Sequence, residues 1–159
     1  TEIIKPELFK MNALTEVFSN RILLAVLCAW FLAQFLKFII VFATESKVEF
    51  DRLFGAGGMP SSHTSSVCAL VTCVGRVCGA GSVEFAICMV LAFIVMYDAS
   101  GVRRAAGQHA AILNKLMDSF ANGTDELANI QLKELLGHTP LQVLFGALLG
   151  VATGLLFKL

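Results

Sequence analysis

The chain is organised as long apolar stretches separated by short polar ones. Residues 22–43 are almost continuously apolar and are interrupted by just two polar side chains, Gln34 and Lys37. A helix of about 20 apolar residues crosses the hydrocarbon core of a bilayer. This stretch therefore predicts a first transmembrane helix.

Three further segments predict spanning helices. Residues 60–80 are small and only moderately apolar, which suits a helix packed closely among other helices. Residues 83–102 are strongly apolar. Residues 141–157 carry glycines at four-residue spacing, a pattern that predicts close helix packing, at positions Gly146, Gly150 and Gly154.

The remaining segments complete the predicted architecture. Residues 103–120 are amphipathic and predict either an interfacial helix or a continuation of the third spanning helix. Residues 44–58 and 121–131 predict loops, and residues 1–20 an amphipathic N-terminal segment. We expect an all-α integral membrane bundle of four to five transmembrane helices plus an amphipathic interfacial helix, forming a single domain over residues 1–159.

Composition supports a membrane setting and removes several functions. The chain is 57% hydrophobic and 15% charged, whereas soluble domains carry about 25% charged residues. Its formal net charge is zero, which argues against a nucleic-acid partner. The cysteines lack the spacing of a zinc site, and we expect no metal or other cofactor.

An up-down-up-down topology gathers the unusual polar residues on one membrane face. That face receives the end of the first helix, the start of the second, the end of the third and the start of the fourth. Charges within spanning segments are costly and usually functional. Glycines leading into the second helix add backbone N–H groups that bind anions. The pattern predicts a phosphate-binding site made by Gln34, Lys37, Gly58, Ser61, Ser62, His63, Asp98, Arg103, Arg104 and His138.

Several motifs support this interpretation. Met59-Pro60-Ser61-Ser62-His63 resembles the Pro-Ser-Gly-His motif of the type 2 phosphatidic acid phosphatase and vanadium haloperoxidase superfamily. Gly137-His138-Thr139-Pro140, which leads into the glycine-rich last helix, resembles its third motif. The segment 95–107, Val-Met-Tyr-Asp-Ala-Ser-Gly-Val-Arg-Arg-Ala-Ala-Gly, together with Gln34-x-x-Lys37, resembles the small divergent bacterial and plant branch of that superfamily.

The resemblance implies a role for each matching residue. It makes His138 the nucleophile, which forms a phosphohistidine, and His63 the group that protonates the leaving oxygen. It makes Ser61 and Ser62 ligands of the phosphate oxygens and Lys37 the lysine of the first motif. It also implies an integral protein of the bacterial cytoplasmic membrane.

Three positions depart from the superfamily pattern. The acid that follows the nucleophilic histidine by four residues is Gln142 here, and an amide orients an imidazole but stabilises less positive charge. The arginine six residues before that histidine is Leu132, and an Arg-Pro pair after the first-motif lysine is missing. We expect Arg103 and Arg104 to supply the missing guanidinium, and Asp98 to orient an arginine or a histidine.

Simpler interpretations of these residues exist. Lys37 would snorkel to the membrane interface, and His63 would cap the second helix. His138 would cap the last helix together with Thr139, and the arginine pair would anchor the third helix.

Three functions fit the pattern. One is a metal-independent phosphatase acting on a lipid-linked or small-molecule phosphate within reach of the membrane. A second is a phosphate or headgroup binding or transport protein that uses the same pocket, and a third, least favoured, is vanadate-dependent oxidation. Expected partners are the phosphate-bearing substrate and membrane lipid, without nucleic acid; a homo-oligomer is left open.

Overall fold

The computed structural model describes residues 15–44, 58–120, 132 and 137–159, and in these residues the chain is helical without any strand. Residues 15–19 form a short helix. The predicted loops 44–58 and 121–131 and most of the N-terminal segment 1–20 lie outside the described residues. The longer helices are α2 Arg21–Thr44, α4 Ser62–Cys78, α5 Val83–Ser100, α6 Val102–Phe120 and α7 Pro140–Leu156.

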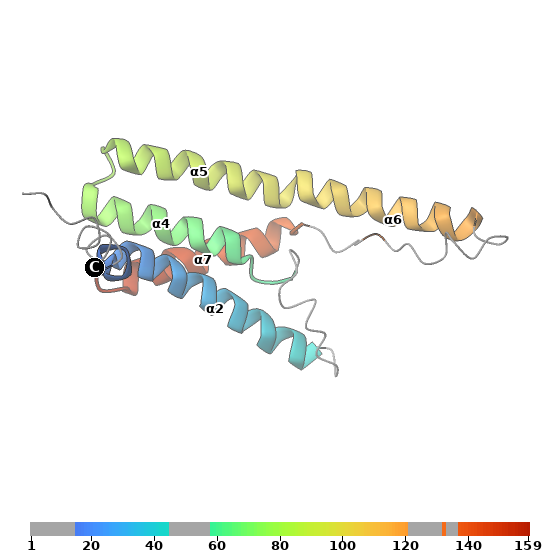
Figure 1. Ribbon diagram of the computed structural model, residues 1–159, viewed down its shortest axis with the longest axis horizontal. Helices are drawn as coiled ribbons and strands as arrows, with labels where there is room; N and C mark the ends of the chain where they lie inside the picture. The colour runs from blue at the N-terminus through green and yellow to red at the C-terminus, as the bar shows by residue number, and fades with distance from the viewer. Residues whose placement is uncertain (1–14, 45–57, 121–131, 133–136) are drawn as a thin grey trace, which may run out of the picture.

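Helix α4 lies at the centre of the bundle and packs against α2, α5 and α7 (Figure 1). Its buried residues are mostly small, so the neighbouring helices approach closely. Its buried hydroxyl groups bond within the protein; Ser65, for example, donates to the carbonyl of Ala29 on α2 at 3.2 Å. The weak hydropathy of this segment is therefore explained by its central position. The buried residues of α4 are Ser62, Thr64, Ser65, Cys68, Ala69, Cys73 and Val74.

The glycine stripe of α7 packs directly against α4, as its spacing predicted. A Cβ atom at Gly146 would lie 2.5 Å from the carbonyl oxygen of Ser61. A Cβ at Gly150 would collide with the carbonyl oxygen of Ser65. At Gly154 the added atom would lie 2.7 Å from Cβ of Thr72. Because side chains there would push the two backbones apart, glycine is needed at each position.

Arginine side chains close the opposite end of the bundle. Arg76 donates to the carbonyl oxygens of Gly154 at 2.6 Å and Phe157 at 2.8 Å. Arg21 donates to the carbonyl oxygen of Lys158 at 3.3 Å. The last carbonyls of a helix have no partner within it, so these contacts satisfy the C-terminus of α7 and tie it to α4 and α2.

The fold is that of a helical membrane protein. Among the described residues, two stretches are long and apolar enough to cross a bilayer, Arg21–Thr44 with 24 residues and Val83–Met117 with 35. Pro140–Leu156 is a shorter apolar helix. Helix α6 continues the direction of α5 (Figure 1), so the amphipathic segment is an extension of the third spanning helix. At about 1.5 Å per residue the 35-residue stretch is about 52 Å long, which exceeds a hydrocarbon core of about 30 Å.

Candidate functional site

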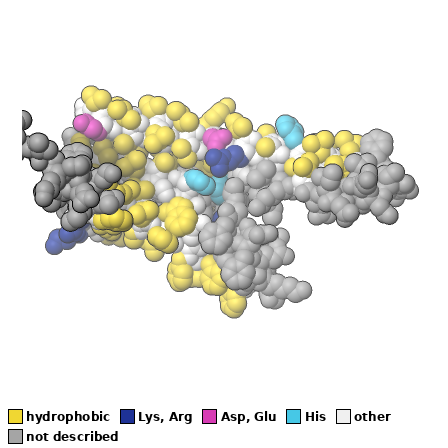
Figure 2. Space-filling view, in the orientation of Figure 1, with side chains coloured by type: hydrophobic (Ala, Val, Ile, Leu, Met, Phe, Trp, Pro, Cys, Tyr) yellow, Lys and Arg dark blue, Asp and Glu magenta, His cyan; other side chains and the backbone are white. Residues whose placement is uncertain are grey.

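Three elements are tied together by backbone hydrogen bonds at one end of the bundle. The amide of His138, just before α7, donates to the carbonyl oxygen of Ala99 in α5 at 2.8 Å. The amide of Ser61, just before α4, donates to the carbonyl oxygen of Gln142 in α7 at 3.2 Å. The starts of α4 and α7 therefore meet the end of α5, as the topology predicted. Figure 2 shows histidine, lysine or arginine, and acidic side chains gathered there within a largely hydrophobic surface.

Lys37 points into this end of the bundle rather than outward to the lipid. It is 2% exposed and continues the buried stripe of α2, which consists of Ala25, Ala29 and Ala33. Gly58 lies against its side chain, because a Cβ atom on that glycine would be 2.8 Å from Cε of Lys37. Gly58 also has a φ of 91°, a conformation that favours glycine. A snorkelling lysine would reach toward the interface, so this placement disfavours that interpretation.

The start of α4 supplies a capped helix N-terminus. Ser61 is the N-cap, and its oxygen accepts from the amide of Thr64 at 3.4 Å and from the Thr64 hydroxyl at 3.0 Å. Ser62 is buried and is the first helical residue, whereas His63 is exposed. The Ser61 oxygen thus accepts hydrogen bonds that cap the helix, and the hydrogen of the Ser61 hydroxyl takes no part in these two bonds. Binding of phosphate by the two serines stays a prediction.

His138 is held by Gln142, one turn further along the chain. The imidazole is 3% exposed, and its Nδ1 lies 3.3 Å from Oε1 of Gln142. The same Oε1 accepts from the amide of Thr139 at 3.0 Å, and Thr139 caps α7. Since an amide oxygen can only accept, this arrangement puts the hydrogen on Nδ1 and the lone pair on Nε2. The expected orienting bond from Gln142 is therefore present, and the cap is Thr139 rather than His138.

The surroundings of His138 favour its neutral form. Burial lowers the pKa of the imidazole below its ordinary value of 6.5, and the positive charges of Lys37 and His63 lower it further. Hydrogen bonds with Gln142 and with the backbone of Gly58 act in the opposite direction and are outweighed. Gly58 thus contacts both Lys37 and His138, and the net effect of these groups is to lower the pKa of the imidazole.

Asp98 orients an arginine rather than the buried histidine. Its Oδ2 accepts from Nε of Arg103 at 2.6 Å, which joins the last turn of α5 to the first turn of α6. Both side chains are partly exposed. The charges of Arg103, Lys37 and Asp98 all act on the imidazole of His63. Lys37, Arg103 and Asp98 therefore lie in the neighbourhood of His63, and Lys37 and His63 in that of His138.

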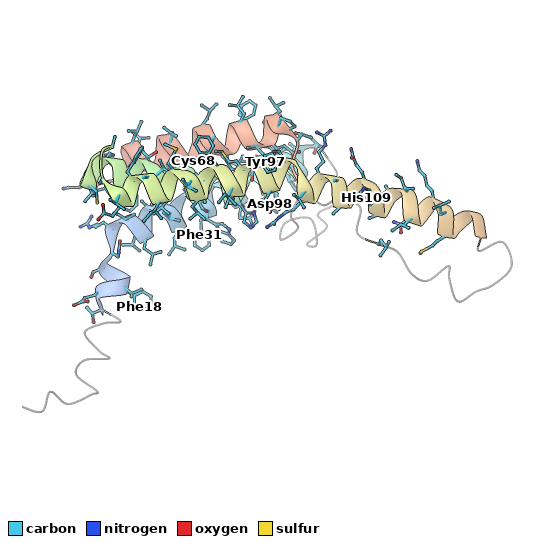
Figure 3. The ribbon with its side chains drawn as sticks, turned by 90° about the horizontal axis from the view of Figure 1, so that it is seen from above. Phe18, Phe31, Cys68, Tyr97, Asp98 and His109 are labelled. Atoms are coloured by element: carbon cyan, nitrogen blue, oxygen red, sulfur yellow. The ribbon has the colours of Figure 1, made fainter. Side chains whose placement is uncertain are left out.

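Arg104 contributes its backbone to the loop that carries His138. Gly137, with a φ of 86°, lies so close that a Cβ atom there would collide with the backbone nitrogen of Arg104. The side chain of Arg104 is exposed. His109, further along α6, is exposed and lies away from Asp98 (Figure 3).

Leu132 is held far along α6. Its N–H and C=O both bond to the side-chain amide of Asn114, each at 2.9 Å. Asn114 follows Arg104 by ten residues, about 15 Å along a helix. The sequence does not mark Asn114 as part of this contact, since an asparagine in a helix carries no signal of a distant backbone partner.

Gln34 is half-buried on α2, one turn before Lys37. Its Oε1 is buried and has no hydrogen-bond partner among the described residues. Binding of phosphate by this side chain stays a prediction.

The fold and the site together define a helical membrane protein with a cationic, histidine-containing cluster at one end of its bundle. Residues 18–153 match the Divergent PAP2 family, and the chain belongs to that family. It is similar to the uncharacterized membrane protein YuiD of Bacillus subtilis (strain 168), with 40% identity over 146 residues. The match covers 86% of this chain and 92% of that protein. No solved structure matches the chain.

Proposed function

We propose that this protein is a membrane phosphatase that removes the phosphoryl group from a phosphate monoester within reach of the membrane. The observation that carries the proposal is the buried His138, whose Nδ1 lies 3.3 Å from Oε1 of Gln142. A neutral ring with its hydrogen on Nδ1 carries its lone pair on Nε2, and this is the nitrogen that would attack phosphorus. Nucleophilic catalysis requires such an oriented and deprotonated group.

The reaction has two steps. In the first, Nε2 of His138 attacks phosphorus, the bond between phosphorus and the ester oxygen breaks, and His63 gives its proton to the departing alcohol. In the second, water attacks the phosphohistidine, His63 takes a proton from that water, and the bond between phosphorus and nitrogen breaks. The products are the alcohol and inorganic phosphate, and both histidines return to their starting states.

The surrounding groups have the charge that a phosphoryl transfer requires. Lys37 and Arg103 are cations in the same neighbourhood as both histidines, and the N-terminus of α4 adds backbone N–H groups. Fixed positive charges of this kind stabilise the charge that develops on the phosphoryl oxygens. Snug placement of Lys37 against Gly58 supports a preorganised site. We place the protein in the bacterial cytoplasmic membrane, as the family resemblance implies.

A second function is favoured by one observation. Gln142 offers His138 an amide rather than a carboxylate, and an amide stabilises the imidazole cation less. A protein that binds or transports phosphate or a phosphate headgroup would keep the cations and the helix N-terminus without turnover.

Phosphate release from a panel of lipid and soluble monoesters, by purified protein in detergent, separates the two functions. We expect release that His138→Ala abolishes and that His109→Ala, an exposed histidine outside the cluster, leaves unchanged. We also expect a rapid quench to trap an acid-labile phosphoryl label on the wild type and not on His138→Ala. Bound phosphate without release or label would support the binding protein and reject the phosphatase.

A further inference from the structure

Gln34 carries an unsatisfied oxygen in an otherwise well-paired part of the bundle. Buried hydroxyls nearby have partners, such as Ser65 with the Ala29 carbonyl and Thr64 with Ser61. Oε1 of Gln34 has none among the described residues. Buried polar groups are usually hydrogen-bonded, and each exception needs an explanation. A ligand that supplies the missing bond is one such explanation.

The position of Gln34 on α2 relates it to the cluster formed by Lys37, His63, Arg103 and His138. Residues three apart on a helix have Cβ atoms about 5–6 Å apart on neighbouring parts of its surface, and Gln34 precedes Lys37 by three. The positive charge of Lys37 acts on the imidazole rings of both His63 and His138. Gln34 is one turn nearer to Arg21 at the opposite end of α2, so it lies deeper in the bundle than the lysine. The side chain is half-buried, so rotation about its χ angles can turn the amide.

The chemistry of an amide oxygen decides what it can bind. It accepts hydrogen bonds and cannot donate them. A phosphate dianion also offers only acceptors, so Oε1 cannot pair with it. The missing partner must be an O–H or N–H group. In a phosphate monoester the nearest place for such a group is the carbon next to the ester carbon.

We propose that Gln34 is a specificity-determining residue that recognises a hydrogen-bond donor on the alcohol part of the substrate. The site then prefers monoesters with a hydroxyl or amide N–H on the carbon next to the ester carbon. This inference rests on the proposed function for the phosphate position. It assigns Oε1 of Gln34 to the alcohol rather than to the phosphate. Lysolipid phosphates and soluble polyol phosphates both carry this donor.

Binding of non-hydrolysable phosphonates tests the inference without requiring turnover. One pair is the phosphonate analogue of 1-acyl-glycerol 3-phosphate and the same chain without the hydroxyl; the soluble pair is built on glycerol and propyl groups. We expect the wild type to bind the hydroxylated member of a pair about tenfold more tightly, as an ordinary hydrogen bond provides. A preference in the acyl pair alone identifies a lipid, and one in both pairs identifies the shared headgroup.

Variants at Gln34 assign the preference to its oxygen. Gln34→Leu should bring the ratio of Kd values close to one, whereas Gln34→Glu keeps an acceptor and should keep the ratio. Gln108→Leu, an exposed glutamine on α6, should leave it unchanged. Gln34→Leu should also raise the unfolding temperature of the unliganded protein, since the unpaired oxygen is gone.

The results separate this inference from the proposed function. An unchanged ratio in Gln34→Leu overturns the inference, because a group other than Oε1 then recognises the hydroxyl. A ratio near one in the wild type overturns it as well. Phosphonate binding with the expected ratio but no phosphate release from any ester leaves the inference standing and rejects the phosphatase.

Discussion

Replacing Gln142 with glutamate tests how far the amide limits the reaction. The two side chains have nearly the same shape, so glutamate can accept from Nδ1 of His138 and from the amide of Thr139 as Gln142 does. The change adds one negative charge about where Oε1 lies, 3.3 Å from Nδ1. When Nε2 attacks phosphorus, the ring becomes a cation, and this charge stabilises it.

The magnitude follows from Coulomb's law at this separation. Two unit charges at 3.3 Å interact by about 1 kcal/mol in water and by about 5 kcal/mol at an effective dielectric constant of about 20. Gln142 is half-buried, and the ring carries only part of its charge in the transition state. We therefore expect the lower part of this range, a gain of about tenfold to a hundredfold in kcat.

The pH dependence of the rate gives a second, independent readout. A carboxylate next to His138 raises its pKa, which burial otherwise holds below the ordinary value. Since the nucleophile must be neutral, the acidic limb of the rate profile should move to higher pH in Gln142→Glu. Gln142→Leu loses the orienting bond and should lower kcat. A faster Gln142→Leu, or a Gln142→Glu with neither a higher rate nor a shifted limb, would refute the orienting role.

Three other predictions follow from the described contacts. Arg103→Ala should weaken phosphate binding at least tenfold, as measured by calorimetry. Adding Leu132→Arg should not restore binding, because the backbone at 132 is held about 15 Å along α6 from Arg104. Restored binding would show that residue 132 reaches the site. Gly150→Ala should lower the free energy of unfolding by about 1–3 kcal/mol, as overpacking does. Thermal unfolding in detergent measures this loss, and Gly81→Ala is the control, because a Cβ atom at Gly81 meets open space. The pKa of His138 in the folded protein lies below its unfolded value near 6.5, so the unfolded chain binds the proton first as the pH falls. The contribution of His138 to the free energy of unfolding should be complete above about pH 6.5 and decline below it. His138→Gln should remove this part of the decline.

Much of the fold could be predicted from periodicity. The predicted first helix at 22–43 and the observed α2 differ by one residue at each end, because a bilayer demands a long apolar stretch that is visible in the sequence. The glycine spacing of α7 predicted its contact face for a similar reason, since a side chain at Gly150 would collide with α4. Connectivity alone then placed Lys37 and His138 at one end.

The partners of individual polar side chains could not be predicted in this way. Asp98 had an arginine and a histidine as candidate partners, and the choice of Arg103 depends on how α6 leaves α5. Asn114 bonds to the backbone of Leu132, and a backbone group carries no sequence signal. Arg76 was visible as a charge in a helix, but the carbonyls of α7 that it caps are known only once α4 and α7 are packed.

The position of Leu132 bears on the expectation that another element supplies the missing arginine. An arginine at that position would start about 15 Å along α6 from Arg104, too far for its side chain to reach the cluster of Lys37, His63, Arg103 and His138. The junction of α5 and α6 is already at the cluster, because the Ala99 carbonyl bonds the amide of His138 and Gly137 packs on the Arg104 backbone. A guanidinium at 103, held by Asp98 at 2.6 Å, starts from this junction, and its replacement of the missing arginine stays a prediction. Loss of Asp98 should then weaken phosphate binding through Arg103, and Asp98→Asn combined with Arg103→Ala should be no worse than Arg103→Ala alone.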